Sequence, residues 1–396
     1  MSARDSVSRT VDQGSVNRVR RESERVHPCQ VALRGGTASD RELLAERLGE
    51  ALSSEFLVGN ARFEEPDVSQ PAPPKLADRS PAGPTAIFSD TTGSITSGPG
   101  PAGLFERRYA LLGCDLVLSQ HDTQPDAADA LPEVLLSGAQ DGGSGDGKAS
   151  AQAGTSSDVI ATVGTQSGPQ ASAVPHFAPA NVAGLAEEIR RQLLARASRT
   201  PVYGLVLAGG RSTRMGRAKW ALEYHGEPQA LALHRLLSRH CERTFLSIHP
   251  GQQGEPELTR LPHVSDRFLG LGPVGGILSA MVTHPEAAWL VVACDMPFVS
   301  DATVERLLRG RAPLRFATTY VSPHDGLPEP LCAIYEPKAR LRLAQLAGMT
   351  YSCPRKLLMN ARIRLIGDVP AQELTNANHP HEYERAVATL STGGPK

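Results

Sequence analysis

Several kinds of residue and pattern that would indicate a particular function are scarce in this sequence. Its 41 Lys and Arg residues are balanced by 42 Asp and Glu residues, so the formal net charge of −1 argues against a globally basic nucleic-acid-binding protein. Aromatic residues make up only 5% of the chain, too few to indicate stacking platforms for single-stranded nucleic acid. The six cysteines form no C-x-x-C pair, which fits free thiols in a reducing compartment better than disulfides or a zinc site.

Long hydrophobic runs are also missing. No stretch of 18 apolar residues occurs, so the sequence predicts no membrane-spanning helix. Residues 1–26 are charged and polar, without the apolar segment of a secretory signal, and the Arg20-Arg21 pair lacks the hydrophobic stretch of a twin-arginine signal. We therefore expect a cytoplasmic protein that binds neither membranes nor nucleic acid.

The texture of the first half predicts a small α/β domain over residues 27–198, after a disordered N-terminus at 1–26. Residues 64–103 and 138–158 are rich in small and polar residues or in proline, and we expect them to be loops or linkers inserted into this domain. The segments expected to be ordered are strands at 30–33, 115–118 and 159–163 and helices at 40–52 and 182–194.

Residues 199–396 read as a second, larger domain, because the 396-residue chain is long enough for two. Apolar runs alternate with amphipathic segments in this half: we expect strands at 202–208, 245–248 and 289–293 and helices at 229–240, 274–282 and 301–309. This alternation predicts βαβ units and a mostly parallel sheet. Ligands of such sheets bind outside the carboxyl ends of the strands.

The most informative motif is LVLAGGRSTRMGRAK at residues 205–219. Gly209 and Gly210 follow an expected strand, and glycines there let backbone N–H groups approach an anion closely. The cations Arg214 and Lys219 would neutralise a polyphosphate. The motif is neither a Walker loop nor a G-x-G-x-x-G fingerprint. The alternative interpretation is a solvated Gly/Arg turn after a core strand.

Four further segments carry residues suited to nucleotidyl transfer. Asp266 follows a short apolar strand, and the turn GPVGGI at 272–277 opens a helix. Asp295 in VVACDMPF follows a buried strand and is a natural Mg²⁺ ligand, since Mg²⁺ prefers one or two carboxylates together with phosphate oxygens. Asn376 and Asn378 precede a C-terminal helix.

Over roughly 200–390 the sequence resembles the molybdenum cofactor guanylyltransferases (MobA-like proteins). The resemblance is carried, in this order, by the motifs LAGG-x-S-x-R-M-G-x-x-K, D, GPxxGI, CDMPF and N-x-N-x-P-x-E. The resemblance implies a Rossmann-like nucleotidyltransferase fold and Mg²⁺-dependent transfer of GMP from GTP to molybdopterin, with release of pyrophosphate. It places Leu207, Ala208, Gly209 and Gly210 on the nucleotide, Lys219 on its phosphates, Asp266 at the guanosine, Asp295 on nucleotide and Mg²⁺, and Asn376 and Asn378 near the pterin. Apo-molybdoenzymes and other cofactor-biosynthesis proteins are candidate partners.

Two positions depart from this pattern or leave it open. Where some relatives carry an asparagine that contacts the nucleotide, this sequence has Ser247 or His249. Arg355 and Lys356 in CPRKLL could meet the pterin phosphate or could form a solvated helix start.

Phosphoryl chemistry predicts a mechanism based on positioning and charge neutralisation by Lys219, Arg214 and Mg²⁺ on Asp295, without a general base. The alternatives are cytidylyl transfer to molybdopterin, nucleotidyl transfer to a sugar phosphate or phospholactate, and a non-catalytic scaffold that delivers cofactor. LAGG at 207–210 resembles the guanylyl branch more than the cytidylyl branch. The presence of Lys219 and Asp295 argues against a scaffold.

The segment QVALRGGTASDRELLAERLGEAL resembles the opening of the molybdopterin-guanine dinucleotide adapter proteins (MobB-like), where strand, P-loop and helix follow one another. Where GK[ST] should stand this chain has SDRE, with Asp40 and Arg41 at the turn. We therefore expect a degenerate P-loop that has lost nucleotide binding. An unrelated small α/β module is the alternative.

Overall fold

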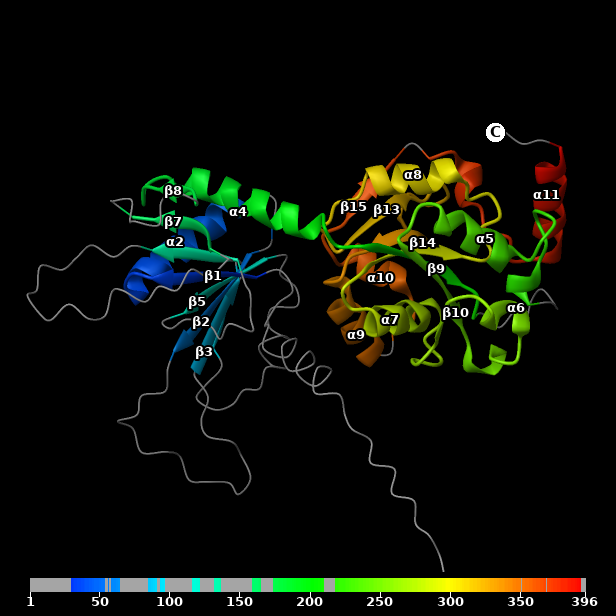
Figure 1. Cartoon of the computed structure of the whole chain (residues 1–396), viewed down its shortest axis with the longest axis horizontal. Helices are drawn as coiled ribbons and strands as arrows, with labels where there is room; N and C mark the ends of the chain where they lie inside the picture. Colours follow the sequence, from blue (N-terminus) through cyan, green and yellow to red (C-terminus); the bar gives the residue numbers. More distant parts are fainter. Residues whose placement is uncertain are drawn as a thin grey trace, which may run out of the picture. The chain divides into compact units, whose positions relative to one another are not determined.

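The computed structural model describes residues 30–53, 56, 58–64, 85–90, 93–96, 116–121, 132–136, 159–164, 174–209, 218–349, 351–367 and 369–392. The chain divides into two compact units, Met1–Gln192 and Leu193–Lys396, and the boundary falls inside helix α4 (Val182–Ala197) (Figure 1). The segments 1–26 and 138–158, for which disorder or a linker was predicted, lie outside the described residues, as do Gly210 and Arg214.

The first unit is built on one sheet. Its elements are β1 (Gln30–Gly35), α2 (Ala38–Leu52), β2 (Val58–Glu64), β3 (Thr85–Asp90), β4 (Gly93–Thr96), β5 (Leu116–His121), β6 (Glu133–Leu136), β7 (Val159–Val163), β8 (His176–Phe177) and α4. The strand order is β4-β3-β2-β5-β1-β6-β7-β8. All neighbouring pairs are parallel except β2–β3 and β3–β4, so the central strands form the parallel α/β arrangement predicted for this half.

Helix α2 follows β1 through a turn of two glycines. Gly35 and Gly36 adopt φ values of 78° and 61°, and a Cβ on Gly35 would lie 2.4 Å from the carbonyl oxygen of Leu136. Glycine is therefore needed at this turn. Leu44 and Leu48 are buried on one face of α2, four residues apart, which is the spacing of an amphipathic helix packed on a sheet.

The expectation that residues 64–103 form only loops was wrong. Strands β3 and β4 lie inside this segment, and β3 pairs antiparallel with β2, with Gly59 opposite Asp90. Proline, glycine and serine around them lowered the local strand signal. Pairing with an already ordered neighbouring strand stabilises such a segment, and composition alone does not reveal that contact.

The second unit also contains a single sheet, covered by helices on both faces. Its strands are β9 (Val202–Leu207), β10 (Arg243–Ile248), β11 (His263–Ser265), β12 (Ala288–Ala293), β13 (Ala317–Val321), β14 (Pro328–Tyr335) and β15 (Arg364–Ile366), in the order β11-β10-β9-β12-β14-β13-β15. Only β14 runs antiparallel to its neighbours, β12 and β13. The mostly parallel, Rossmann-like α/β fold predicted for this half is confirmed.

The helices and 3-10 turns of this unit are η1 (Lys219–Ala221), α5 (Gln229–Ser238), η2 (Pro250–Gln252), α6 (Pro256–Thr259), α7 (Pro273–Thr283), α8 (Asp301–Arg309), α9 (Ala339–Gly348), α10 (Pro354–Met359), η3 (Ala371–Leu374) and α11 (Pro380–Ser391). Side chains of β12 alternate between the two faces: Leu290 and Val292 pack with residues of α5 and α8, whereas Trp289 and Val291 pack with residues of α7, α9 and α10. Figure 1 shows these helix sets on opposite faces of the sheet. Strand β12 is thus buried on both sides.

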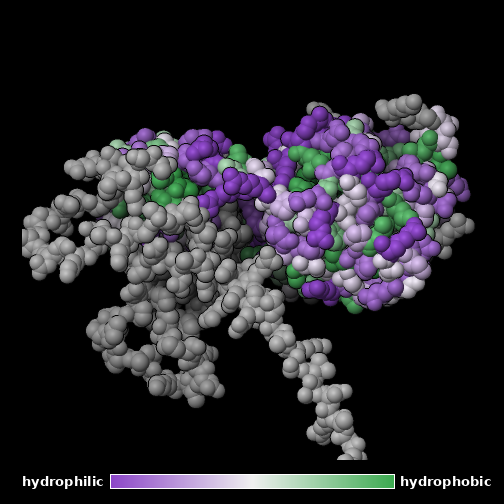
Figure 2. Space-filling view, in the orientation of Figure 1, coloured by the Kyte–Doolittle hydropathy of each residue, from purple (hydrophilic) through white to green (hydrophobic). Residues whose placement is uncertain are grey.

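The surface of the second unit is mostly hydrophilic in the view of Figure 2, with smaller hydrophobic patches between the charged side chains. Among the described residues, no helix combines the length and the apolar character needed to cross a bilayer. The exposed large apolar side chains include Leu269, at 56% exposure, and Met359, also at 56%.

Candidate active site

A pocket of about 680 Å³ opens where β9, β10 and β12 end, which is the edge at which parallel α/β sheets bind ligands. Its lining comes from the ends of these strands and the segments that follow them, from the segment between β11 and α7, from the start of α7 and from one residue of β14. The lining residues are Leu207, Ala208, Gly209, Lys219, Ser247, His249, Asp266, Phe268, Leu269, Gly270, Gly272, Pro273, Gly276, Ala293, Cys294, Asp295 and Leu331. Six of the residues predicted for the nucleotide site thus meet in one cavity.

One wall of the pocket is built around Asp266. The buried hydroxyl of Ser247 donates a hydrogen bond of 2.7 Å to Oδ1 of Asp266. A Cβ on Gly209 would lie 2.8 Å from Oδ2 of Asp266, and a Cβ on Gly276 would lie 2.4 Å from Oγ of Ser247. Glycine at both positions therefore lets the turn after β9 and helix α7 approach the carboxylate and its serine closely.

Burial raises the pKa of Asp266, while the hydrogen bond from Ser247 and the nearby His249 oppose the rise. As a carboxylate, Asp266 can accept two neighbouring N–H donors of a ligand. Ser247 and His249 both line the pocket beside it. Sequence reasoning had left the choice between these two residues open.

The turn after β10 is tied to the turn after β9 by Gln252, which sequence reasoning missed. Its Nε2 donates to the carbonyl oxygen of Ala208 at 3.1 Å, and its Oε1 accepts the backbone N–H of His249 at 2.8 Å. The N–H of Ala208 in turn donates to the carbonyl oxygen of Ser247. No sequence signal marks Gln252, because its role depends on a contact between the turn after β9 and the turn after β10, which are distant along the chain.

The charged groups lie on the β12 side of the pocket, whereas Asp266 follows β11, three places away in the strand order. Nζ of Lys219 lies 2.8 Å from Oδ2 of Asp295 and 2.6 Å from Oδ1 of Asn378. The side chains of Lys219 and Asp295 are 24% and 14% exposed, so this ion pair is largely shielded from water. The structure places Asn378, expected near the pterin, directly on the lysine expected to bind phosphate.

Two buried oxygens suit a magnesium ion, one on this side of the pocket and one in the segment that is bonded to the Asp295 turn. Oδ1 of Asp295 and Oδ1 of Asn376 are both buried and have no hydrogen-bond partner among the described residues. Mg²⁺ prefers oxygen ligands, and carboxylate and amide oxygens both serve it. Burying an unpaired polar oxygen is costly, so atoms of this kind fit a ligand-binding role. The residues present therefore fit the metal predicted at Asp295.

The segment that carries the two asparagines is fastened to the Asp295 turn through the backbone. The N–H of Ala377 donates to the carbonyl oxygen of Asp295 at 2.7 Å. Glu382, in the first turn of α11, accepts the N–H groups of Asn378 and His379 at 2.7 and 3.0 Å. The hydrogen bond from Asn378 lowers the pKa of Glu382. Asn378 is thus held at the start of a capped helix.

Arg355 and Lys356, at the start of α10, do not line this pocket. Nη1 of Arg355 donates to Oδ2 of Asp325 at 2.7 Å, and its Nη2 lies 3.8 Å from Oε2 of Glu329. Nζ of Lys356 lies 3.8 Å from the ring centroid of Tyr351. Both cations thus have partners within the protein at their places on α10.

Glu329 is a second residue that sequence reasoning missed. Its side chain is buried on β14, burial raises its pKa, and its Oε1 accepts the N–H of Leu331 at 2.9 Å. Leu331, which donates this hydrogen bond, lines the same pocket as Asp295, and Asp295 also raises the pKa of Glu329. The sequence signal that could have identified Glu329 is a charged residue inside the apolar run PEPLCAIY.

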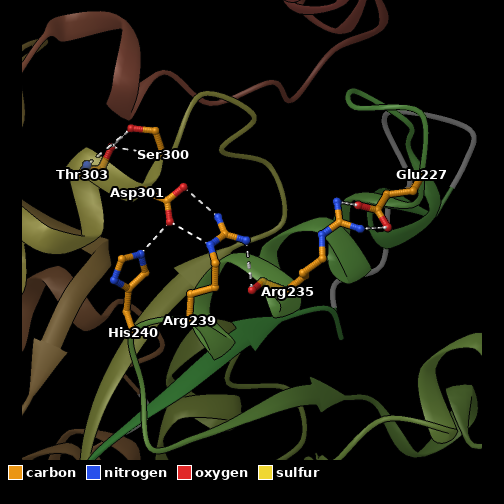
Figure 3. A network of polar contacts seen from close by, with 7 residues as sticks. All are labelled: Glu227, Arg235, Arg239, His240, Ser300, Asp301 and Thr303. Carbon is orange, nitrogen blue, oxygen red and sulfur yellow. Dashed lines mark hydrogen bonds and ion pairs between the residues drawn. The ribbon is translucent and has the colours of Figure 1, made fainter. Parts of the chain in front are cut away.

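Outside the pocket lining, a surface network joins the end of α5 to α8, the helix that follows the Asp295 turn. Asp301 accepts hydrogen bonds from Arg239 at 2.7 and 3.0 Å and contacts Nε2 of His240 at 2.6 Å (Figure 3). Ser300 and Thr303 cap the same end of α8 through a pair of reciprocal hydrogen bonds. These contacts fix the start of α8 and with it the far end of the Asp295 turn.

Comparison with known proteins identifies the family. The MobA-like NTP transferase domain matches residues 204–363. A molybdenum cofactor biosynthesis bifunctional protein of Synechocystis sp. is 38% identical over 190 residues, which cover 48% of this chain and 54% of that protein. A probable molybdenum cofactor guanylyltransferase of Mycobacterium tuberculosis is 35% identical over 153 residues, covering 37% of this chain and 74% of that protein.

A molybdenum cofactor guanylyltransferase of Xanthomonas euvesicatoria is 32% identical over 194 residues, which cover 47% of this chain and 95% of that protein. The match to the bifunctional relative spans about half of its length. The matched domain is a nucleotidyltransferase, as the motifs predicted. The chain therefore belongs to the molybdenum cofactor guanylyltransferase family.

Proposed function

We propose that this protein transfers GMP from GTP to molybdopterin and releases pyrophosphate. The observation that carries the proposal is one pocket with a carboxylate, Asp266, at one end and the Lys219–Asp295 pair at the other. The first suits the N–H groups of a guanine ring, and the second suits a triphosphate with its metal. The relatives named as guanylyltransferases support the same assignment.

In this proposal the nucleotide lies between the two ends of the pocket. Leu207, Ala208 and Gly209 approach it along the backbone, and Asp266 accepts the N–H groups of the base. Lys219 contacts the phosphates, assisted by Gly210 and Arg214 of the same motif. Asp295 and Asn376 would hold Mg²⁺, which when bound neutralises charge on the triphosphate.

The chemistry needs positioning more than proton transfer. An oxygen of the terminal phosphate of molybdopterin attacks the α-phosphorus of GTP in line. The bond from that phosphorus to the oxygen bridging to the β-phosphate breaks, and pyrophosphate leaves with the electron pair. A phosphate nucleophile is already ionised at neutral pH, so no general base is required. Lys219 stabilises the charge that develops on the leaving group.

The acceptor side is proposed to lie at Asn376 and Asn378, where the C-terminal segment reaches the phosphate end of the pocket. Arg355 and Lys356 remain candidates for the pterin phosphate, although a bound phosphate would have to compete with Asp325 for Arg355. Apo-molybdoenzymes and other cofactor-biosynthesis proteins are the proposed recipients and partners of the product.

Pyrophosphate release tests the proposal when it is measured with GTP, CTP, ATP and UTP, each with molybdopterin, with a sugar phosphate, with phospholactate or without an acceptor. Release with GTP that depends on molybdopterin is the expected result. Preference for CTP would indicate the cytidylyl branch, and release only with a sugar phosphate or phospholactate would indicate another acceptor. Nucleotide binding without release under any of these conditions would leave the scaffold interpretation.

A further inference from the structure

The C-terminal helix α11 reaches the reaction centre without forming the nucleotide pocket. Every residue that lines the pocket lies between Leu207 and Leu331. Yet Asn378, two residues before α11, accepts a hydrogen bond from Lys219, 159 residues earlier in the chain. The segment before α11 therefore contacts the catalytic groups while leaving the walls of the nucleotide site to other loops.

Two tyrosines fasten α11 to the segment after η1, which turns back on itself through an antiparallel bridge between Glu223 and Pro228. The rings of Tyr224 and Tyr383 meet edge to face, with centroids 5.1 Å apart and planes inclined by 64°. The hydroxyl of Tyr383 donates to the carbonyl oxygen of Glu223 at 3.1 Å. Leu222, Tyr224, Ala377 and Ala386 form a separate small apolar cluster, against which Phe298, Tyr383, Val387 and Leu390 pack.

Tyr224 occupies the centre of this contact. Its side chain is 6% exposed, and its hydroxyl has no hydrogen-bond partner among the described residues. Burial raises the pKa of Tyr224, and the nearby Asp295 raises it further. An unpaired buried hydroxyl costs stability, so the ring of Tyr224, not its hydroxyl, provides the favourable contact with α11.

We infer that Tyr224 and Tyr383 are positioning residues that hold Asn378 against Lys219, so that α11 serves the transfer step rather than nucleotide binding. This inference rests on the proposed function. With Asn378 in place, the Lys219 ammonium is shared between Oδ2 of Asp295 and Oδ1 of Asn378. Without it, the ammonium is free to turn fully onto Asp295 and to compete with the metal for that carboxylate.

Substitution of Tyr383 separates the two roles. Tyr383→Leu is expected to lower kcat with both substrates saturating by about tenfold, since small misplacements of catalytic groups cost one to two orders of magnitude in rate. The Kd of GTP, measured by calorimetry without acceptor, should change less than twofold. Tyr383→Phe keeps the ring contact and should retain most of kcat. Glu384→Ala, at an exposed position on the same helix, is the matched control.

Amide hydrogen exchange provides a readout that does not depend on activity. Exchange at Ala377, Asn378 and His379, whose N–H groups bond Asp295 and Glu382, should accelerate in Tyr383→Leu and in Tyr224→Leu but not in Glu384→Ala. Tyr224→Phe should leave this exchange unchanged, because it removes only the unpaired hydroxyl.

Equal losses in kcat and in GTP affinity would show a general structural role and overturn the inference, as would unchanged kcat in Tyr383→Leu. If the wild-type protein binds GTP but transfers no GMP, the proposed function fails. The exchange data then decide the positioning role separately: unchanged exchange in both leucine variants would overturn it.

Discussion

Both units place glycine in the turn that follows a parallel strand, and the two turns have opposite surroundings. In the first unit, Asp40 accepts the N–H and the hydroxyl of Thr37 at 2.9 and 2.7 Å, so the chain's own carboxylate sits at the start of α2. Nη1 of Arg41 donates to the carbonyl oxygens of Gly35 and Gly36. The turn of the first unit is thus closed by its own charged side chains.

In the second unit the corresponding turn faces a cavity. Gly209 lines the pocket opposite Asp266, and the next described cation, Lys219, reaches the far end of the same pocket. A glycine turn after a strand permits close approach of an anion but does not specify one. The two turns differ in the partners of the charged residues that follow them. In the first unit these partners lie within the turn itself, and in the second unit they lie across an open pocket.

The largest effect should come from Asp295, the carboxylate paired with Lys219 in the second unit. Asp295→Asn is expected to lower turnover by about 100-fold or more while the fold stays intact, because a single charge-stabilising group often contributes that much. Steady-state pyrophosphate release at saturating Mg²⁺ measures it, with circular dichroism as the control for folding. Activity close to wild type would remove Asp295 from the metal-binding role.

The next largest effect is expected from Lys219, the cation that follows the glycine turn of the second unit. Lys219→Ala should weaken GTP binding by about tenfold to a hundredfold, the range expected for one charge-assisted hydrogen bond to phosphate. The affinity for guanosine should stay unchanged, because Asp266 lies at the other end of the pocket. Calorimetry with both ligands measures the difference. Equal losses for GTP and guanosine would mean that Lys219 does not contact phosphate.

The glycine turn of the first unit, between β1 and α2, should contribute stability without binding nucleotide. Calorimetry on the full chain is expected to find one GTP site per chain. Thr37→Ala removes the cap of α2 and should cost about 1 kcal/mol of stability in the first unit, with GMP transfer unchanged. Thermal unfolding and pyrophosphate release measure the two outcomes. A second GTP site that is lost in Thr37→Ala would contradict the contrast between the two turns.

The smallest effect is expected at the surface of the second unit. The Arg239 guanidinium, together with His240, holds the pKa of Asp301 below its usual range. Its contribution to stability is therefore present above the ordinary aspartate pKa of about 3.9 and is lost as the pH falls through the lower folded value. Half of the Asp301 side chain is exposed, so Asp301→Asn should cost less than about 1 kcal/mol at pH 7.

Chemical unfolding of wild type and Asp301→Asn, compared at pH 7 and near pH 2.5, measures this dependence. The difference between the two proteins should shrink at the lower pH. A difference that grows as the pH falls would contradict the assigned direction.

Much of the site could be predicted because it follows the strands. Asp266 and Asp295 come directly after apolar strands, and parallel strands bring such residues to one edge of the sheet. Contacts between segments far apart in sequence could not be predicted in this way. The bond from Lys219 to Asn378 and the pairing of Arg355 with Asp325 depend on how α11 and α10 pack, which local residue patterns do not encode.

The direction of strand β14 could not be predicted from the sequence either. Strand β14 reverses between β12 and β13 because it pairs antiparallel with both, and an apolar run reads the same in either direction. The reversal brings Glu329 toward the catalytic edge, at the amino end of its strand. A buried carboxylate at that end would have been assigned to the opposite edge in a uniformly parallel sheet.

The hydrogen bond between Lys219 and Asn378 also joins the reaction centre to a late part of the chain. A ribosome makes the residues of the strands and of the nucleotide pocket before it makes residue 378. Joining the two residues closes a long loop, whose entropic cost grows only slowly with length. Assembly of the reaction centre can thus follow formation of the sheet, and a chain that ends before Asn378 would retain the pocket walls but lack the last catalytic contact.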